Sequence, residues 1–176
     1  MIKRSYAIIF SLSVVVTAGG LAHAQQPPPT DPQSSKHESM EMMNARGDKV
    51  MGFDHLKTSH HFLLKSDGGL IRIEANDAGD KESRDQIRAH LRHIAKMFSE
   101  GNFSAPMLIH AENPPGTAVM KQLKESIKYD FAENEQGAQI KISTSNAQAL
   151  KAIYDFLRFQ IKEHMTGDPL EVDPAG

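Results

Sequence analysis

The chain has 176 residues, of which 39% are hydrophobic and 24% charged, and its formal net charge at neutral pH is −2. This composition is typical of a folded globular protein, and it excludes disorder throughout the chain. Basic residues are scattered among acidic ones, which argues against nucleic acid as a partner. The chain has no cysteine, which excludes disulfide bonds, thiolate ligands and thiol catalysis.

The first 24 residues have the pattern of a secretory signal peptide. Lys3 and Arg4 precede an apolar run, and Ala22-His23-Ala24 has the small-x-small pattern of a signal-peptidase site. The apolar run is shorter than the ~20 residues of a spanning helix, so a retained anchor is the less favoured alternative. We expect cleavage near Ala24 and a periplasmic or secreted protein that has no membrane attachment afterwards.

Residues 25–45 are expected to form a disordered tether, because prolines and polar residues leave little apolar surface to order them. Met40, Met42 and Met43 lie at its end. Clustered thioethers can bind Cu(I), although methionine also fills the apolar side of short helices, which is the favoured interpretation. A single domain is expected at residues 46–168, followed by a C-terminal tail at residues 169–176.

Two short segments open the domain. The first, Gly47-Asp48-Lys49-Val50-Met51-Gly52-Phe53, has the glycines of a shaped loop, and the second is Thr58-Ser59-His60-His61-Phe62. In these segments the chain resembles a group of uncharacterised small exported bacterial proteins that share Gly-Asp-x-Val-Met-Gly-Phe followed by Thr-x-His-His-Phe. The resemblance extends through the C-terminal helix. It implies export and a shared fold, and it assigns no catalytic residue.

A hairpin is predicted where apolar residues alternate on both sides of Ser66-Asp67-Gly68-Gly69. Ser83 is expected to cap a following helix that runs to about Glu100. Further along, Pro106 precedes the apolar run Met107-Leu108-Ile109-His110, for which an edge strand or an extended connection is expected.

A second hairpin and helix follow. Thr117 is expected to cap a short helix, and two alternating runs flank the turn Asn134-Glu135-Gln136-Gly137. Thr144, Ser145 or Asn146 can cap a last helix that runs to about Met165.

The two hairpin-helix units, at about residues 58–101 and 117–167, share a pattern. Ile87-x-x-His90-Leu91-Arg92-His93 in the first helix matches Ile153-x-x-Phe156-Leu157-Arg158-Phe159 in the last. We therefore predict an α+β fold of pseudo-duplicated ββα units, with a four-stranded antiparallel sheet and two long helices on one face.

The difference between the two helices points to metal binding. His90, His93 and Met97 lie on one flank of the first helix, where the last helix has Phe156 and Phe159. A covered imidazole must satisfy its nitrogens, and two imidazoles spaced i and i+3 can bind one ion.

The predicted first strand can supply a third ligand, because one of His60 and His61 must face the helices. His60 is favoured, since it shares its parity with Phe62 and Leu64. Imidazole and thioether ligands in an exported chain without thiols suit copper first and zinc second. The candidate metal ligands are His90, His93, His60, His61, His110 and Met97.

The alternative hypothesis is a metal-free periplasmic interaction or dimerisation domain with structural histidines. The last helix spreads apolar surface over a wide arc, which a homodimer would bury. An enzyme is not favoured, because the sequence contains neither a His-Glu-x-x-His run nor a nucleophile elbow.

Overall fold

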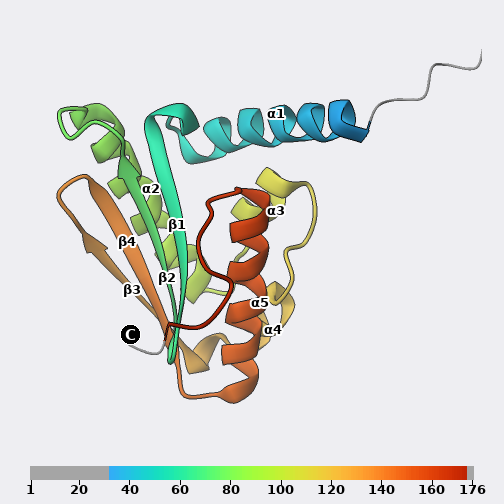
Figure 1. Ribbon diagram of the computed structural model, residues 1–176. Helices are drawn as coiled ribbons and strands as arrows, with labels where there is room; N and C mark the ends of the chain where they lie inside the picture. Colours follow the sequence, from blue (N-terminus) through green and yellow to red (C-terminus); the bar gives the residue numbers. More distant parts are fainter. Residues whose placement is uncertain (1–31, 174–176) are drawn as a thin grey trace, which may run out of the picture. The chain divides into compact units, whose positions relative to one another are not determined.

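Four antiparallel strands in the order β1-β2-β4-β3 form the sheet of the computed structural model, which describes residues 32–173 (Figure 1). The predicted signal peptide and the first residues of the predicted tether lie outside the described residues. The strands alternate buried and more exposed side chains, because successive side chains point to opposite faces of a sheet. Their bounds are Thr58–Lys65 for β1, Gly68–Ala75 for β2, Ile127–Glu133 for β3 and Gly137–Thr144 for β4.

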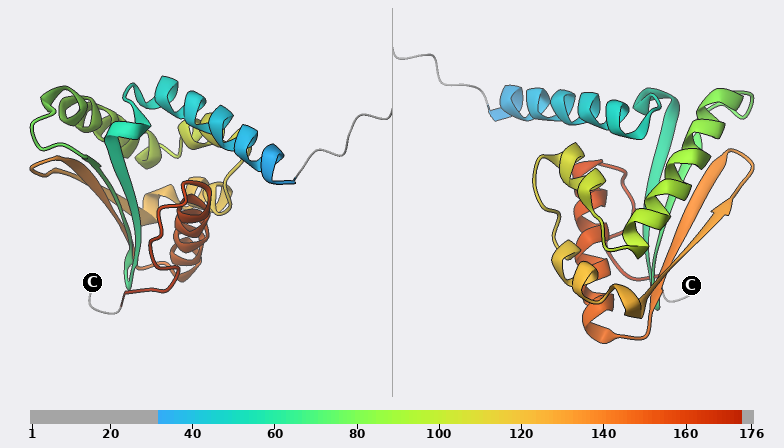
Figure 2. Two further views of the ribbon diagram at one scale, coloured as in Figure 1. Left: turned by 45° about the horizontal axis from the view of Figure 1, so that its top comes forward. Right: turned by 180° about the vertical axis from the view of Figure 1, so that it is seen from behind.

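Two long helices cover one face of this sheet, α2 at Lys81–Ser99 and α5 at Ala147–Glu163 (Figures 1 and 2). The α2 helix packs mainly on β3 and β4, and α5 packs on β1 and β2. Their buried residues recur at helical spacing, so each helix presents one apolar stripe to the sheet. The predicted fold class and the duplication of ββα units are therefore confirmed.

The duplication is also visible in the two central strands. Gly68-Gly69-Leu70-Ile71 opens β2, and Gly137-Ala138-Gln139-Ile140 opens β4. Ile71 and Ile140 face each other across the β2–β4 ladder. The two units are thus related by an approximate two-fold axis between these strands, and their apolar faces form one shared core.

Polar side chains cap both long helices. The Asn146 side chain accepts hydrogen bonds from two backbone N–H groups at the start of α5, so the cap is one of the three predicted residues. For α2 the predicted cap, Ser83, was wrong. Asp80 is the cap, because its carboxylate accepts both the Ser83 N–H at 3.0 Å and the Ser83 hydroxyl at 2.8 Å.

The first helix, α1 at Pro32–Met51, covers most of the segment that was expected to be a disordered tether. It packs against α3, at Ser104–His110. The side chains of Met43 and Met51 are buried, and Arg46 Nε donates to the Ile109 carbonyl at 2.8 Å. The composition of this segment gave no sign of this order, because its apolar residues are buried by distant parts of the chain.

The segment Met107-Leu108-Ile109-His110 is part of α3, so the expected edge strand was wrong. Pro106 lies in the first turn of this helix, where no intrahelical N–H donor is lost. Ala105, Pro106 and Ile109 are buried at helical spacing.

A short helix, α4 at Thr117–Gln122, follows. Its N-cap is Gly116 and not Thr117, whose hydroxyl donates to the Pro114 carbonyl at 2.7 Å. Gly116 has φ +84, and a Cβ there would clash with the backbone of Ala152 in α5. This position therefore requires glycine. Single turns of 3-10 helix lie at His55–Lys57 and Lys124–Ser126.

Segments of the same chain cover the apolar arc of α5. The α4 helix packs on it, and Phe159 meets the ring of His110 at 5.0 Å. The residues after α5 run back along β1, where the Asp173 N–H donates to the Leu64 carbonyl at 2.9 Å. Among the described helices, none combines the length and the apolar character needed to cross a membrane.

Candidate histidine and methionine cavity

Two imidazoles from opposite ends of the sequence stack against each other. His60 points from β1 toward the helices, as strand parity predicted, and His164 is the C-cap residue of α5. Their ring centroids are 5.5 Å apart and their planes differ by 12°. Nε2 of His60 is buried and makes no hydrogen bond within the part of the chain that the structure describes. A buried polar atom without a partner is costly, so its position needs an explanation.

A third imidazole, His110 at the end of α3, meets His164 edge to face at 5.1 Å. Its Nε2 lies 3.2 Å from Oε1 of Gln160, a buried residue of α5. Because an amide oxygen only accepts, Nε2 carries the proton and Nδ1 of His110 keeps its lone pair. That Nδ1 and the Gln160 Nε2 are both buried and unpartnered among the described residues.

Phe53 joins a fourth imidazole to the group. His90 of α2 meets the Phe53 ring edge to face at 5.6 Å, and the same ring stacks on His60 at 6.1 Å. A small hollow of about 60 Å³ is lined by His60, His90, His164 and Gln160 together with apolar residues. The four histidines therefore form one cluster, and each comes from a different element of the fold.

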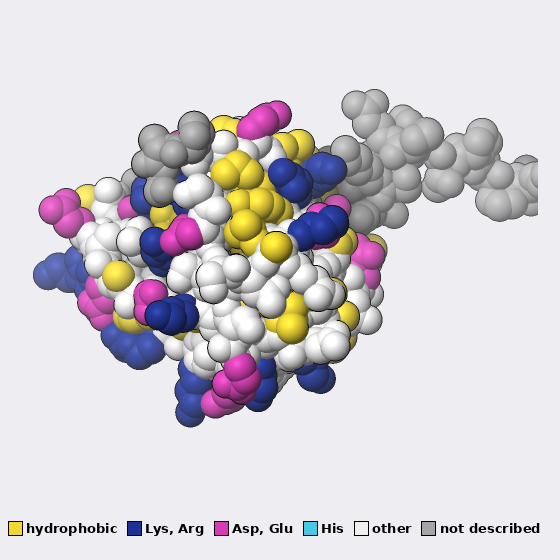
Figure 3. Space-filling view, turned by 90° about the horizontal axis from the view of Figure 1, so that it is seen from below, with side chains coloured by type: hydrophobic (Ala, Val, Ile, Leu, Met, Phe, Trp, Pro, Cys, Tyr) yellow, Lys and Arg dark blue, Asp and Glu magenta, His cyan; other side chains and the backbone are white. Residues whose placement is uncertain are grey.

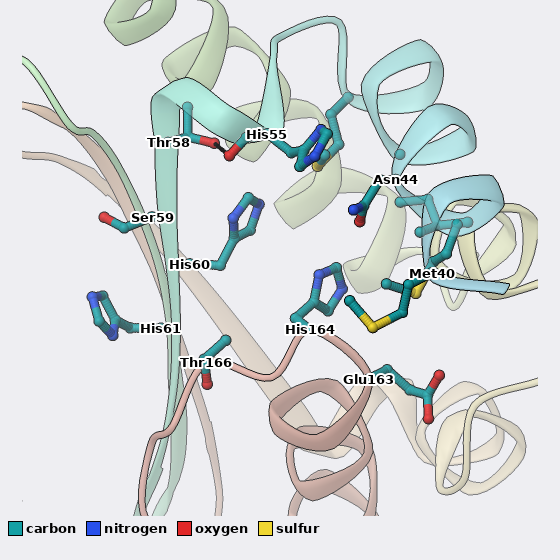
Figure 4. A pocket seen from close by; sticks show the side chains of 14 residues that line it. Met40, Asn44, His55, Thr58, Ser59, His60, His61, Glu163, His164 and Thr166 are labelled. Carbon is teal, nitrogen blue, oxygen red and sulfur yellow. Dashed lines mark hydrogen bonds between the residues drawn. The ribbon is translucent and has the colours of Figure 1, made fainter. Parts of the chain in front are cut away.

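The cluster borders a larger cavity of about 300 Å³ beneath α1 (Figure 4). His60 and His164 point into it from the sheet and from the end of α5, and Met40 reaches toward them from α1. Three methionine side chains of α1 line it, those of Met40, Met43 and Met51. By contrast, the face shown in Figure 3 mixes acidic, basic and hydrophobic side chains, and no histidine is visible there.

His55 lines the same cavity and is held by a carboxylate. Its Nδ1 lies 2.9 Å and 3.0 Å from the two oxygens of Asp48, and its backbone N–H donates to the same side chain. A carboxylate accepts hydrogen bonds, so Nδ1 carries the proton and Nε2 presents its lone pair. Asp48, Asp54 and His55 form a possible metal-binding group, because one ligand atom of each lies within 4.8 Å of the other two. It is the group of this kind found among the described residues.

Burial keeps the clustered imidazoles neutral near pH 7. It lowers the pKa of His60 and His90 to about 4, with a further contribution from neighbouring histidines. Burial, with His60 and His110 close by, lowers the pKa of His164 to about 3. The pKa of His110 is also lowered by burial, although the hydrogen bond that its ring donates to Gln160 acts in the opposite direction. A neutral imidazole has the lone pair that a metal ligand requires.

The duplication provides an internal comparison for this cluster. Aligning the two hairpins pairs His60 with Tyr129, and extending the helix alignment to the helix ends pairs His164 with Phe98. Tyr129 and Phe98 are in contact, with centroids 5.9 Å apart. The position related to the histidine pair by the approximate two-fold axis is thus filled with aromatic rings, which shows that this fold can pack there without imidazole.

Two of the predicted ligands on α2 lie apart from the cavity. His93 is exposed, and Met97 packs against the hydrophobic core. The i and i+3 pair of His90 and His93 therefore does not converge on one point, because α2 buries its stripe on β3 and β4 and leaves His93 outside.

His61 faces the opposite side of β1 from His60 (Figure 4). Its Nδ1 lies 3.0 Å from an oxygen of Asp168, whose other oxygen accepts the Phe62 N–H and the Thr166 hydroxyl. These hydrogen bonds lower the pKa of Asp168 although burial opposes them. The pair attaches the chain after α5 to the edge strand β1, which is a structural role.

The sequence prediction missed His164. The alignment of the two helices nevertheless runs past this residue to Gly101 and Gly167, and it places His164 opposite Phe98. Of the predicted ligands, His60, His90 and His110 lie in the cluster. No family model, curated protein or solved structure matches the chain.

Proposed function

We propose that this protein binds a transition metal ion, with copper preferred to zinc, in the cavity between His60 and His164. The main support is the buried Nε2 of His60, which has no hydrogen-bond partner among the described residues although it lies beside a second neutral imidazole. The position related to this pair by the approximate two-fold axis has Tyr129 and Phe98. Since packing does not demand imidazole there, coordination accounts for its presence.

Further donors are close to this pair. His55 lines the cavity, and the carboxylate that holds its Nδ1 is the arrangement that orients imidazole ligands in metal proteins. His110 has a free Nδ1 beside His164. Among the described residues, no three of these imidazole nitrogens lie within 4.8 Å of one another, so side-chain rotation would have to bring them to one ion. The role that we propose is binding and handling of the ion.

The test measures thermal unfolding of the mature chain with Cu(I), Cu(II) or Zn(II). At a free metal concentration of about 100 times Kd, linkage adds about 2.7 kcal/mol of stability. For a protein of this size we expect Tm to rise by on the order of 5–10 °C. The variant His60→Tyr/His164→Phe gives each position the residue of its aligned counterpart, Tyr129 or Phe98, and should lose this rise in Tm.

The control variant is His93→Phe, which changes an exposed histidine to its counterpart in α5 and should keep the metal-dependent rise. If no metal stabilises the wild-type chain, the metal proposal fails. If the double variant responds to metal as the wild type does, the site lies elsewhere.

Export is part of this proposal. It is supported by Lys3 and Arg4, the apolar run behind them and the Ala22-His23-Ala24 pattern. We expect the protein isolated from the producing cells to begin at Gln25, which N-terminal sequencing checks. A mature protein that begins at Met1 would contradict cleavage.

A metal-free interaction or dimerisation domain is the second candidate function. It is favoured by exposed apolar side chains on α1 and α3, where Met42 is 58%, Met107 38% and Leu108 55% exposed. Light scattering of the metal-free chain should then give the mass of a dimer that Leu108→Asp dissociates. A monomer at all concentrations would count against self-association.

A further inference from the structure

The α1 helix brings sulfur donors to the histidine cavity. Met40, Met43 and Met51 line it, and Met43 and Met51 are buried with exposed fractions of 6% and 9%. Met42 belongs to the same helix but is 58% exposed and does not line the cavity. The helix therefore presents Met40, Met43 and Met51 to the cavity on one side and Met42 to solvent on another.

Specific contacts hold α1 over the cavity. Arg46 Nε donates to the Ile109 carbonyl of α3 at 2.8 Å. Gly47 is buried at this crossing, and a Cβ there would lie 3.3 Å from the terminal methyl of Met51. The close approach of α1 and α3 thus positions Met51 at the cavity wall.

The donors around the cavity are soft or borderline. Neutral imidazole and thioether suit Cu(I), whereas Zn(II) and Cu(II) prefer sites that also offer anionic or harder donors. Asp48 and Asp54 have carboxylate oxygens within 4.8 Å of a His55 nitrogen, but neither residue lines the cavity, and Asp48 is hydrogen-bonded to His55. Glu163 lines the cavity but is exposed at its rim. Within the described residues, the chemistry of the wall therefore favours the cuprous ion.

We propose that the ion bound by this cavity is Cu(I) and that methionines of α1 complete its coordination together with His60 and His164. This inference rests on the proposed metal-binding function and adds the oxidation state and the sulfur donors. In this arrangement α1 is the closing element of the site, and its methionines bind the ion through their sulfur atoms.

Anaerobic competition with a chromophoric Cu(I) chelator such as bicinchoninate tests the proposal. The variant Met40→Leu/Met43→Leu/Met51→Leu preserves side-chain volume and should bind Cu(I) at least about tenfold more weakly. Its affinity for Cu(II) and Zn(II) should stay within about threefold of the wild type. The matched control is Met42→Leu, which changes a methionine of the same helix outside the cavity and should bind Cu(I) as the wild type does.

X-ray absorption of the Cu(I)-loaded wild-type chain gives a second readout that needs no variant. Because the chain has no cysteine, any sulfur neighbour of the copper must be a methionine. We expect sulfur in the first coordination shell of the copper, and a first shell of nitrogen alone would overturn the proposal.

The outcomes separate this inference from the function on which it rests. If the triple methionine variant binds Cu(I) as the wild type does, while His60→Tyr/His164→Phe binds no metal, the sulfur donors are refuted and the histidine site stands. If the wild-type chain binds none of the three ions, both proposals fail.

Discussion

At the scale of single residues, His60 and His164 do not behave as ordinary packing residues. Two half-buried imidazoles with their planes 12° apart gain less from burial than the aromatic pair Phe98 and Tyr129 at the two-fold-related position. Because these imidazoles stay neutral in the folded chain, they lower the free energy of unfolding as the pH falls. In the unfolded chain a histidine takes up a proton below about pH 6.5, whereas burial prevents this in the folded chain.

The first prediction concerns His164→Phe without metal. Burial lowers the pKa of His164 to about 3 in the folded chain, so the unfolded state binds more protons as pH falls below 6.5 and stability is lost until about pH 3. The variant avoids this loss. Between pH 7.5 and pH 5 its free energy of unfolding should improve relative to wild type by at most about 2 kcal/mol.

Urea unfolding at both pH values measures this difference. His93→Phe is the control, because the side chain it replaces is exposed, and it should show little dependence on pH relative to wild type. An equal effect of both variants would contradict the role assigned to burial.

At the scale of elements, the helix ends depend on single polar side chains. Asn146 accepts hydrogen bonds from the N–H groups of Gln148 and Ala149, at 2.9 Å and 3.0 Å. Its own N–H donates to the Thr144 hydroxyl at 3.0 Å, which connects β4 to α5. The start of α5 is thus fixed by residues that the sequence had narrowed to three.

The second prediction follows from this cap. Asn146→Ala leaves two N–H groups of α5 without their acceptor and should lower the free energy of unfolding by about 1 kcal/mol. Ser145→Ala is the matched control at the neighbouring position, where a cap was also possible, and should change stability by less than about 0.5 kcal/mol. Chemical denaturation of both variants decides between the two residues.

At the scale of the whole molecule, the two units share one core across the approximate two-fold axis. Leu157 of α5 is fully buried and packs on Gly69 of β2, where a Cβ would clash with it. Leu91 is its counterpart in α2 and is 1% exposed. Because the core is continuous, neither unit can bury its apolar face alone.

The third prediction tests this shared core. Leu157→Ala and Leu91→Ala should each lower the free energy of unfolding by about 2–5 kcal/mol, since both remove a buried side chain and leave a cavity. In both variants a single unfolding transition is expected, monitored by circular dichroism and by fluorescence of the tyrosines. The control is Leu170→Ala in the more exposed C-terminal segment, 37% exposed in the wild type, with a loss of less than about 1 kcal/mol. Two separate transitions would show that the units fold independently.

Periodicity was sufficient to predict the sheet, the hairpins and the two long helices, because a strand repeats its buried residues every second position and a helix every third or fourth. The inward direction of His60 followed from the same rule. The Ser83 cap was wrong, since Asp80 lies three residues earlier and its two carboxylate oxygens accept the Ser83 N–H and the Ser83 hydroxyl. The strand expected near Met107 was wrong because a short apolar run does not distinguish strand from helix.

The sequence by itself determined the four strands, the two long helices and the duplication, because these depend on residues close together in the chain. Only the tertiary structure decided the composition of the site. His60 and His164 lie far apart in the sequence and are neighbours because α5 returns its C-terminal end to the start of β1. Likewise, α1 is ordered by burial of Met43 and Met51 against distant residues. Contacts between remote segments leave no periodic signal, so they are decided by the packing of the whole chain.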